Sequence, residues 1–105
     1  MKKVLIICAG GMSSSLIAKL ICEKLQETSD EFTCDFSGVY EARSKLEKNE
    51  YDLFLESPQV RFLHDFMMKY ASVSQANLVQ IPPFDYVPVP KRITNLSRLI
   101  LDNID

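Results

Sequence analysis

Histidine and cysteine are scarce in this chain of 105 residues, and each shortage excludes a kind of site. The only histidine is His64, so a histidine-rich metal centre is excluded. The three cysteines, Cys8, Cys22 and Cys34, are odd in number and form no CxxC pair, which disfavours both a disulfide framework and a zinc site. We therefore expect neither a metal ion nor another cofactor.

An excess of charge of one sign and a long apolar run are also missing. The net charge is −2 and the lysines and arginines are scattered, so nothing indicates a nucleic-acid-binding surface. No apolar run approaches the roughly 20 residues that cross a bilayer. Residues 1–10, MKKVLIICAG, begin like a secretory signal, but their apolar run is too short and cleavage there would destroy the motif at Cys8. We expect a cytoplasmic protein.

Strand-like and helix-like segments alternate along the chain, which is long enough for one domain with a single core. Strands are expected over residues 3–9, 32–38, 51–57 and 76–82, and helices over residues 13–27, 40–50, 59–72 and 91–105. Four prolines in residues 82–90 predict an irregular loop before the last helix. This order predicts an α/β fold, a single domain with a four-stranded parallel sheet and helices on both faces.

The apolar spacing also predicts where particular side chains lie. Residues 3–9 form a continuous apolar run, typical of a strand that is covered on both faces. The first helix should turn inward Leu16, Ile17, Leu20, Ile21 and Leu25. The second strand should turn inward Phe32, Cys34 and Phe36. Ser13 or Ser14 is available as the N-cap of the first helix, and Ser57 precedes Pro58 as a cap residue.

The turn after the first strand carries the chemistry. Ligands of open α/β sheets bind beyond the carboxyl ends of the strands, and Cys8 ends the first strand there. Gly10 and Gly11 allow a sharp turn and a close approach of the backbone to a ligand. Free amides at the start of the following helix bind an oxyanion and favour the thiolate form of Cys8. We predict Cys8 as the nucleophile and a phosphate-binding turn formed by Ala9, Gly10, Gly11, Met12, Ser13, Ser14 and Ser15.

Other interpretations of these residues and of the turn fit less well. Cys22 and Cys34 fit small buried side chains, and His64 fits a structural or exposed residue because no glycine loop lies beside it. A Walker loop requires a lysine, and none occurs between Lys3 and Lys19. The dinucleotide motif GxGxxG is absent as well, which disfavours a nucleotide ligand.

The segment CAGGMSSSL, residues 8–16, resembles the active-site loop of the lactose/cellobiose (chitobiose) class of IIB components of the bacterial sugar phosphotransferase system. That loop reads roughly Cys-x-x-Gly-Met-Ser-[Ser/Thr]-Ser, and the matching residues are Cys8, Gly11, Met12, Ser13, Ser14 and Ser15. The resemblance covers essentially residues 1–105 as one IIB domain. One departure is Ser57-Pro58-Gln59, where the family has Gly-Pro-Gln.

The resemblance implies a phosphocarrier with protein-phosphohistidine–sugar phosphotransferase activity. Cys8 would accept a phosphoryl group from the phosphohistidine of a IIA partner and pass it to a sugar bound by the membrane IIC partner. The class implies a β-linked disaccharide such as cellobiose, chitobiose or lactose. Amides of the turn would stabilise the charge on the transferred group, and no metal is required.

Two alternatives belong to other classes of protein. Low-molecular-weight phosphatases and arsenate reductases resemble the same architecture, and Asp85 would be their candidate acid. Their Cys-x5-Arg loop, however, has arginine where this chain has Ser14, so the bidentate clamp on a phosphate ester is missing. A thiol redox sensor or an anion-binding module is the second alternative. Cys22 lies roughly 15 to 20 Å from Cys8 along the helix, beyond disulfide reach, whereas pairing of Cys8 with Cys34 is left open.

Overall fold

The computed structural model describes residues 2–9, 12–28 and 31–104, with the backbone alone for residues 12–14. Its elements follow the order β1 (Lys2–Cys8), α1 (Met12–Gln26), β2 (Phe32–Gly38), α2 (Val39–Lys48), β3 (Leu53–Glu56), the 3-10 helix η1 (Pro58–Leu63), α3 (His64–Ser74), β4 (Leu78–Gln80) and α4 (Pro90–Asn103). Four strands form one parallel sheet in the order β2-β1-β3-β4. The predicted fold class is confirmed.

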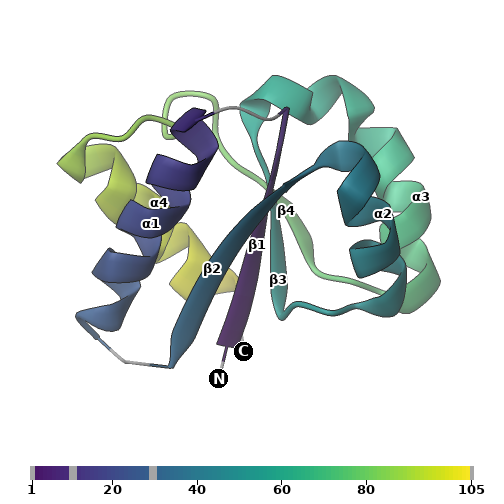
Figure 1. Cartoon of the computed structure of the whole chain (residues 1–105), viewed down its shortest axis with the longest axis horizontal. Coiled ribbons are helices and arrows are strands. Elements are labelled where there is room, and N and C mark those ends of the chain that lie inside the picture. The colour runs from purple at the N-terminus through teal and green to yellow at the C-terminus, as the bar shows by residue number, and fades with distance from the viewer. Residues whose placement is uncertain (1, 10–11, 29–30, 105) are drawn as a thin grey trace.

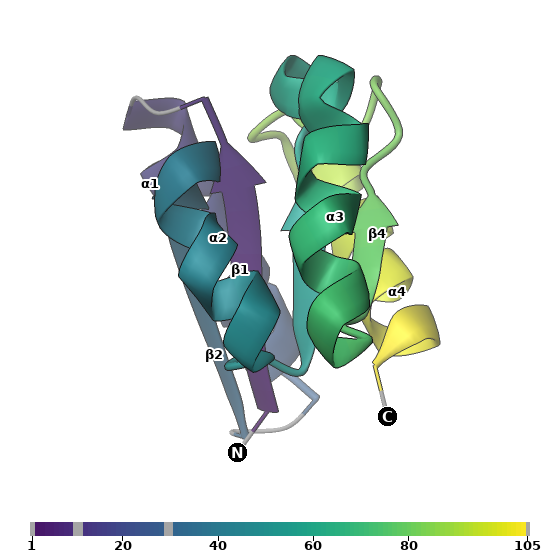
Figure 2. The same cartoon turned by 90° about the vertical axis from the view of Figure 1, so that its right-hand side faces the viewer.

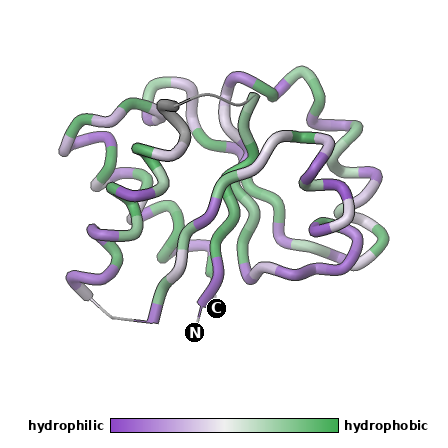
Figure 3. The backbone as a smooth tube through the Cα atoms, viewed as in Figure 1, coloured by the Kyte–Doolittle hydropathy of each residue, from purple (hydrophilic) through white to green (hydrophobic). Residues whose placement is uncertain are grey.

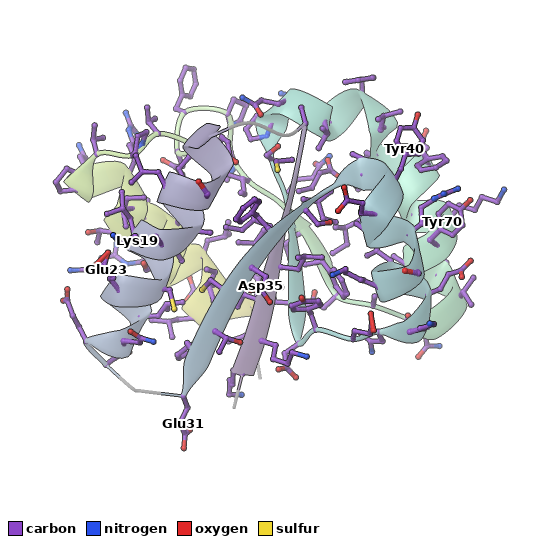
Figure 4. The ribbon with its side chains drawn as sticks, viewed as in Figure 1. Lys19, Glu23, Glu31, Asp35, Tyr40 and Tyr70 are labelled. Atoms are coloured by element: carbon purple, nitrogen blue, oxygen red, sulfur yellow. The ribbon has the colours of Figure 1, made fainter. Side chains whose placement is uncertain are left out.

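Helices cover both faces of the sheet. Figure 1 shows α1 and α4 on one side of the strands and α2 and α3 on the other. In the view turned by 90°, α2 and α3 lie side by side in front of the sheet (Figure 2). Lys19 and Glu23 mark the outer, polar side of α1 (Figure 4). The carboxyl ends of the strands therefore meet at one edge, at the top of Figure 1, together with the start of α1 and the 3-10 helix.

Strand β1 is the centre of the core, as the continuous apolar run predicts. Its residues from Val4 to Cys8 are at most 1% exposed. Val4 and Ile6 pack into the cluster that contains α1 and α4 residues, whereas Leu5 and Ile7 pack into the cluster beneath α2 and α3. The hydropathy-coloured tube shows the same contrast between apolar central strands and mixed helices (Figure 3).

Three side-chain predictions are wrong at the periphery of this core. Leu16 is 45% exposed because the buried stripe of α1 runs through Ile17 and Ile21, which leaves Leu16 on the flank. Phe36 is 47% exposed because β2 is an edge strand of the sheet. The N-cap prediction for Ser13 or Ser14 fails because α1 already begins at Met12.

The segment after β3 departs from the single helix that the sequence predicts. Residues Pro58–Leu63 form the 3-10 helix η1, which meets α3 with a break at Val60, where φ is −115° and ψ is 15°. Ser57 occupies the N-cap position with Pro58 next, as predicted, but its hydroxyl makes no capping hydrogen bond. The other elements agree with the predicted order, with boundaries that shift by a few residues. Residues 81–89 are irregular, as their prolines predict.

The contrast between a central and an edge strand yields a stability prediction. Phe54 of β3 is fully buried and packs edge-on against Tyr51 at 5.7 Å between ring centroids. Phe54→Ala should lower the free energy of unfolding by about 3–5 kcal/mol, because it leaves a cavity in the core. Phe36→Ala, on the half-exposed edge, should cost about 1 kcal/mol or less. Urea unfolding of both variants measures the difference, and equal losses would contradict the assigned burial.

Candidate functional site

Cys8 lies at the carboxyl end of the central strand, between β2 and β3. It pairs with Gly38 in the register of β1 with β2. The residue is 1% exposed, and its thiol donates a hydrogen bond to the carbonyl oxygen of Ser37, with 3.4 Å between sulfur and oxygen. The cysteine that ends a strand at the carboxyl edge of the sheet is thus held in a defined position.

A hollow of about 400 Å³ opens beside Cys8 at this edge. Cys8, Ala9 and Gly38 line it from the sheet, and Tyr40 and Phe62 line it from α2 and η1. The two aromatic side chains are 65% and 79% exposed, respectively. The hollow therefore places an exposed aromatic wall beside the strand end at which Cys8 lies.

Aromatic contacts fix one side of that wall. Tyr40, at the start of α2, packs edge-on against Phe66 of α3 at 5.7 Å, and Phe66 packs in the same way against Tyr70 at 5.2 Å. Figure 4 shows Tyr40 and Tyr70 on the same side of the molecule, over α2 and α3. The row of rings joins the start of α2 to α3 and holds Tyr40 at the hollow.

The predicted phosphate-binding turn is described in part. Ala9 is exposed next to Cys8 and lines the hollow, and Ser15 is exposed in the first turn of α1. Gly10 and Gly11 lie outside the described residues, as do the side chains of Met12, Ser13 and Ser14. Because α1 begins at Met12, its first backbone amides, which lack partners within the helix, belong to this edge of the sheet.

A polar cluster that the sequence did not predict lies at the same edge. The side chain of Glu56, at the end of β3, is completely buried. Its Oε1 is 2.7 Å from Nδ1 of His64, and its Oε2 accepts a hydrogen bond of 2.9 Å from Nε2 of the Gln80 side chain. His64 begins α3 rather than lying in mid-helix, and its Nδ1 faces the carboxylate. The sequence signal that indicates this cluster is Glu56, an acidic residue directly after the apolar run of β3.

Asp85, the candidate acid of the phosphatase alternative, is bound to α4. Its Oδ1 accepts hydrogen bonds of 3.2 Å from Nη1 of Arg92 and from the side-chain amide of Asn95. These contacts tie the proline-rich loop to the helix that follows it. The Asp85 carboxylate therefore connects this loop to α4, whether or not it takes part in chemistry at Cys8.

The structure separates the cysteines into two groups. Cys34 is in register with Val4, four residues before Cys8 on β1, which corresponds to about 13 Å along the strand. That separation excludes a Cys8–Cys34 disulfide in this fold. Cys34 instead neighbours Cys22, and burial, followed by the charge and hydrogen bond of Cys22, raises the pKa of the Cys34 thiol.

Thiol reactivity tests this environment. Because thiolate is the reactive form and the pKa of Cys34 is raised, we expect Cys34 to resist iodoacetamide in the native protein at mildly alkaline pH. In urea the same residue should react like an ordinary cysteine. Peptide mapping by mass spectrometry measures both states, and equal labelling of Cys34 in the two would contradict the assigned environment.

Metal and membrane features can be assessed for the described residues only. Across residues 2–9, 12–28 and 31–104, no three histidine, cysteine or acidic side chains gather in a way that could hold a metal ion. In the same part of the chain no helix combines the length and apolar character of a membrane span.

The fold and the candidate site define a class of protein, a parallel α/β domain with a buried cysteine at the carboxyl edge of its sheet. Residues 3–87 match the family model described as "PTS system, Lactose/Cellobiose specific IIB subunit". The chain belongs to this lactose/cellobiose-specific IIB family of the phosphotransferase system, and the resemblance seen at residues 8–16 is confirmed.

A solved structure supports the same fold. The lactose-specific IIB component domain of the phosphoenolpyruvate:carbohydrate phosphotransferase system from Streptococcus pneumoniae superposes with a TM-score of 0.82. It is 23% identical in sequence, and the match covers 99% of this chain and 98% of the other. The search of curated proteins finds no significant match.

Proposed function

We propose that this chain is one IIB unit over residues 1–105, a cytoplasmic phosphocarrier that acts between a IIA partner and a membrane IIC partner. IIB domains act as phosphotransferases in sugar uptake, which supports the role at the level of the family. The observation that carries the finer proposal is the position of Cys8. A nucleophilic side chain ends the central strand at the ligand-binding edge and lines a hollow with an exposed wall.

The proposed reaction has two transfers at sulfur. The thiolate of Cys8 attacks the phosphorus of the IIA phosphohistidine, so that the S–P bond forms while the electrons of the P–N bond return to the imidazole ring. A sugar hydroxyl then attacks the same phosphorus, the electrons of the S–P bond return to sulfur, and the hydroxyl proton leaves to solvent or to a base. Neither transfer requires a metal ion from this chain.

The turn supplies the electrostatic part of the proposal. The residues assigned to bind the phosphoryl oxygens are Ala9, Gly10, Gly11, Met12, Ser13, Ser14 and Ser15. Backbone amides at a helix start favour an anion, and donors that are fixed before the reaction stabilise charge without reorganisation. Ser14 in place of a loop arginine fits a carrier, because its phosphocysteine must persist until the next partner arrives.

The family description names the lactose/cellobiose class, which supports a sugar of that class. Within it we propose a β-linked disaccharide such as cellobiose, chitobiose or lactose, held by the IIC partner during transfer. The choice among these sugars then lies with IIC, and the IIB unit contributes the activated phosphoryl group.

Intact-mass analysis tests the proposal. After incubation with a phosphorylated IIA protein of the lactose/cellobiose class, the protein should gain the mass of one phosphoryl group. Cys8→Ser should abolish the addition, whereas Cys22→Ser and Cys34→Ser should retain it, since both of those residues lie apart from the edge. Phosphorylation that persists in Cys8→Ser, for example on His64, would overturn the proposal.

The exposed wall of the hollow is the proposed docking site of the IIA partner. Tyr40 and Phe62 line the same hollow as Cys8, and Met12 and residues 82–88 are proposed to complete the rim. Transient complexes of this kind use small interfaces in which a few aromatic or apolar anchors dominate the affinity.

A matched pair of variants tests this docking site. Phe62→Ser should slow phosphoryl uptake from IIA roughly tenfold or more, because it removes a central anchor. Val73→Ser, on α3, is a suitable control because Val73 is 71% exposed, close to the 79% of Phe62. Both melting temperatures should stay near that of the wild type. Equal uptake rates in the two variants would place the docking site elsewhere.

A further inference from the structure

The side-chain hydroxyl of Ser57 is buried next to the carboxyl edge of the sheet. The residue is 0% exposed, and its Oγ has no hydrogen-bond partner among the residues that the structure describes. Its place before Pro58 would suit a capping role, but the side chain makes no cap hydrogen bond. Burying a hydroxyl without a hydrogen-bond partner destabilises a folded protein. A ligand that supplies this partner would therefore stabilise the state to which it binds.

The sheet places Ser57 directly beside Cys8. Ile7 of β1 is in register with Glu56 of β3, and the amide of Ser57 donates a hydrogen bond of 2.9 Å to the carbonyl oxygen of Ile7. Continued by one residue, this register brings Ser57 next to Cys8, at the usual strand separation of about 4.8 Å. Ser57 keeps an extended backbone, with φ −69° and ψ 153°.

The pleat turns both side chains to the same face of the sheet. Val4 and Ile6 of β1, like Leu53 and Leu55 of β3, pack into the cluster beneath α1 and α4. Continuing the alternation by two residues brings Cys8 and Ser57 to that face, which is the face of α1. Glu56 lies one residue earlier and points to the opposite face, where His64 and Gln80 already occupy its oxygens.

We propose that the Ser57 hydroxyl donates a hydrogen bond to an oxygen of the phosphoryl group carried by Cys8. This inference rests on the proposed function and adds a residue to its site. The Cys8 sulfur contacts the carbonyl oxygen of Ser37 on the β2 side, whereas Ser57 flanks Cys8 on the β3 side. In phosphocysteine the phosphoryl oxygens lie two bonds beyond the sulfur, so they extend the reach of Cys8 toward Ser57. The proposed hydrogen bond from the Ser57 hydroxyl is strong because the phosphoryl oxygen that accepts it is charged.

The hydroxyl then binds the phosphoryl group, and its contribution to stability differs between the free and the phosphorylated protein. In the free protein it has no partner among the described residues, which is destabilising, and in the phosphorylated protein it is paired and stabilising. The sequence pattern of the family has glycine at this position, so the resemblance assigns the hydroxyl no role. Ser57 would therefore shift the transfer equilibrium toward the phosphorylated IIB protein.

Titration with a phosphorylated IIA protein of the lactose/cellobiose class tests the inference. The equilibrium constant for phosphoryl transfer to Cys8, measured by intact mass, should fall roughly tenfold or more in Ser57→Ala. Ser57→Gly should show the same loss, and Ser57→Thr, which keeps the hydroxyl, should restore much of it. The melting temperature of unphosphorylated Ser57→Ala should rise by a few degrees, because the variant removes a buried hydroxyl that has no partner among the described residues.

Ser97→Ala is the matched control. Ser97 is also buried, at 5% exposure, but its hydroxyl donates to the carbonyl oxygen of Ile93 within α4. This variant should transfer the phosphoryl group like the wild type, and its melting temperature should not rise.

The remaining outcomes separate the two proposals. Ser57 also lines a small cavity of about 180 Å³ with Arg61 and Gln80, where solvent could bind its hydroxyl. If water alone binds the Ser57 hydroxyl, Ser57→Ala should have the same transfer equilibrium as the wild type. That result would overturn the role of Ser57 but not the proposed phosphocarrier function. A wild-type protein that takes up no phosphoryl group on Cys8 would overturn both.

Discussion

The burial of β1 on both faces is the constraint on which the rest of the structure depends. A strand between two neighbours, with helices above and below it, has no side that tolerates a polar group, and the residues from Val4 to Ile7 are accordingly aliphatic. Polar chemistry can begin only where the strand ends. The thiol of Cys8 stands at that boundary, so a buried framework determines the position of the reactive atom.

The same boundary explains why buried polar groups collect at the carboxyl edge. Glu56 and Ser57 follow the apolar part of β3 at the level where Cys8 follows that of β1. Glu56 has two side-chain partners from later elements, His64 and Gln80, and so joins β3, α3 and β4. Ser57 has none among the described residues. One residue contributes to the rigidity of the edge, and the other is the residue that we propose as a partner of the phosphoryl group.

The sequence predicted the features that depend on neighbouring residues along the chain, namely the element types and the strand end at Cys8. The continuous run of residues 3–9 and the alternation of element types were sufficient for the fold class, and the position of Cys8 followed from the end of that run. The prediction failed where the exposure of a side chain depends on the position of its strand within the sheet. Phe36 repeats the apolar alternation of its strand, yet it is half-exposed because the neighbour order makes β2 an edge. The contacts of Glu56 with His64 and Gln80 depend on long-range packing, which no spacing along the chain encodes.

Because every strand is followed by a helix that runs back, the chain starts and finishes at the edge opposite to Cys8. Figures 1 and 2 show both ends below the sheet, on the side away from η1 and the start of α1. A fluorophore, an affinity tag or a surface tether attached at either end would thus leave the rim around Cys8 accessible. The topology makes the domain suitable for immobilised binding measurements in which every molecule presents the same edge to its partner.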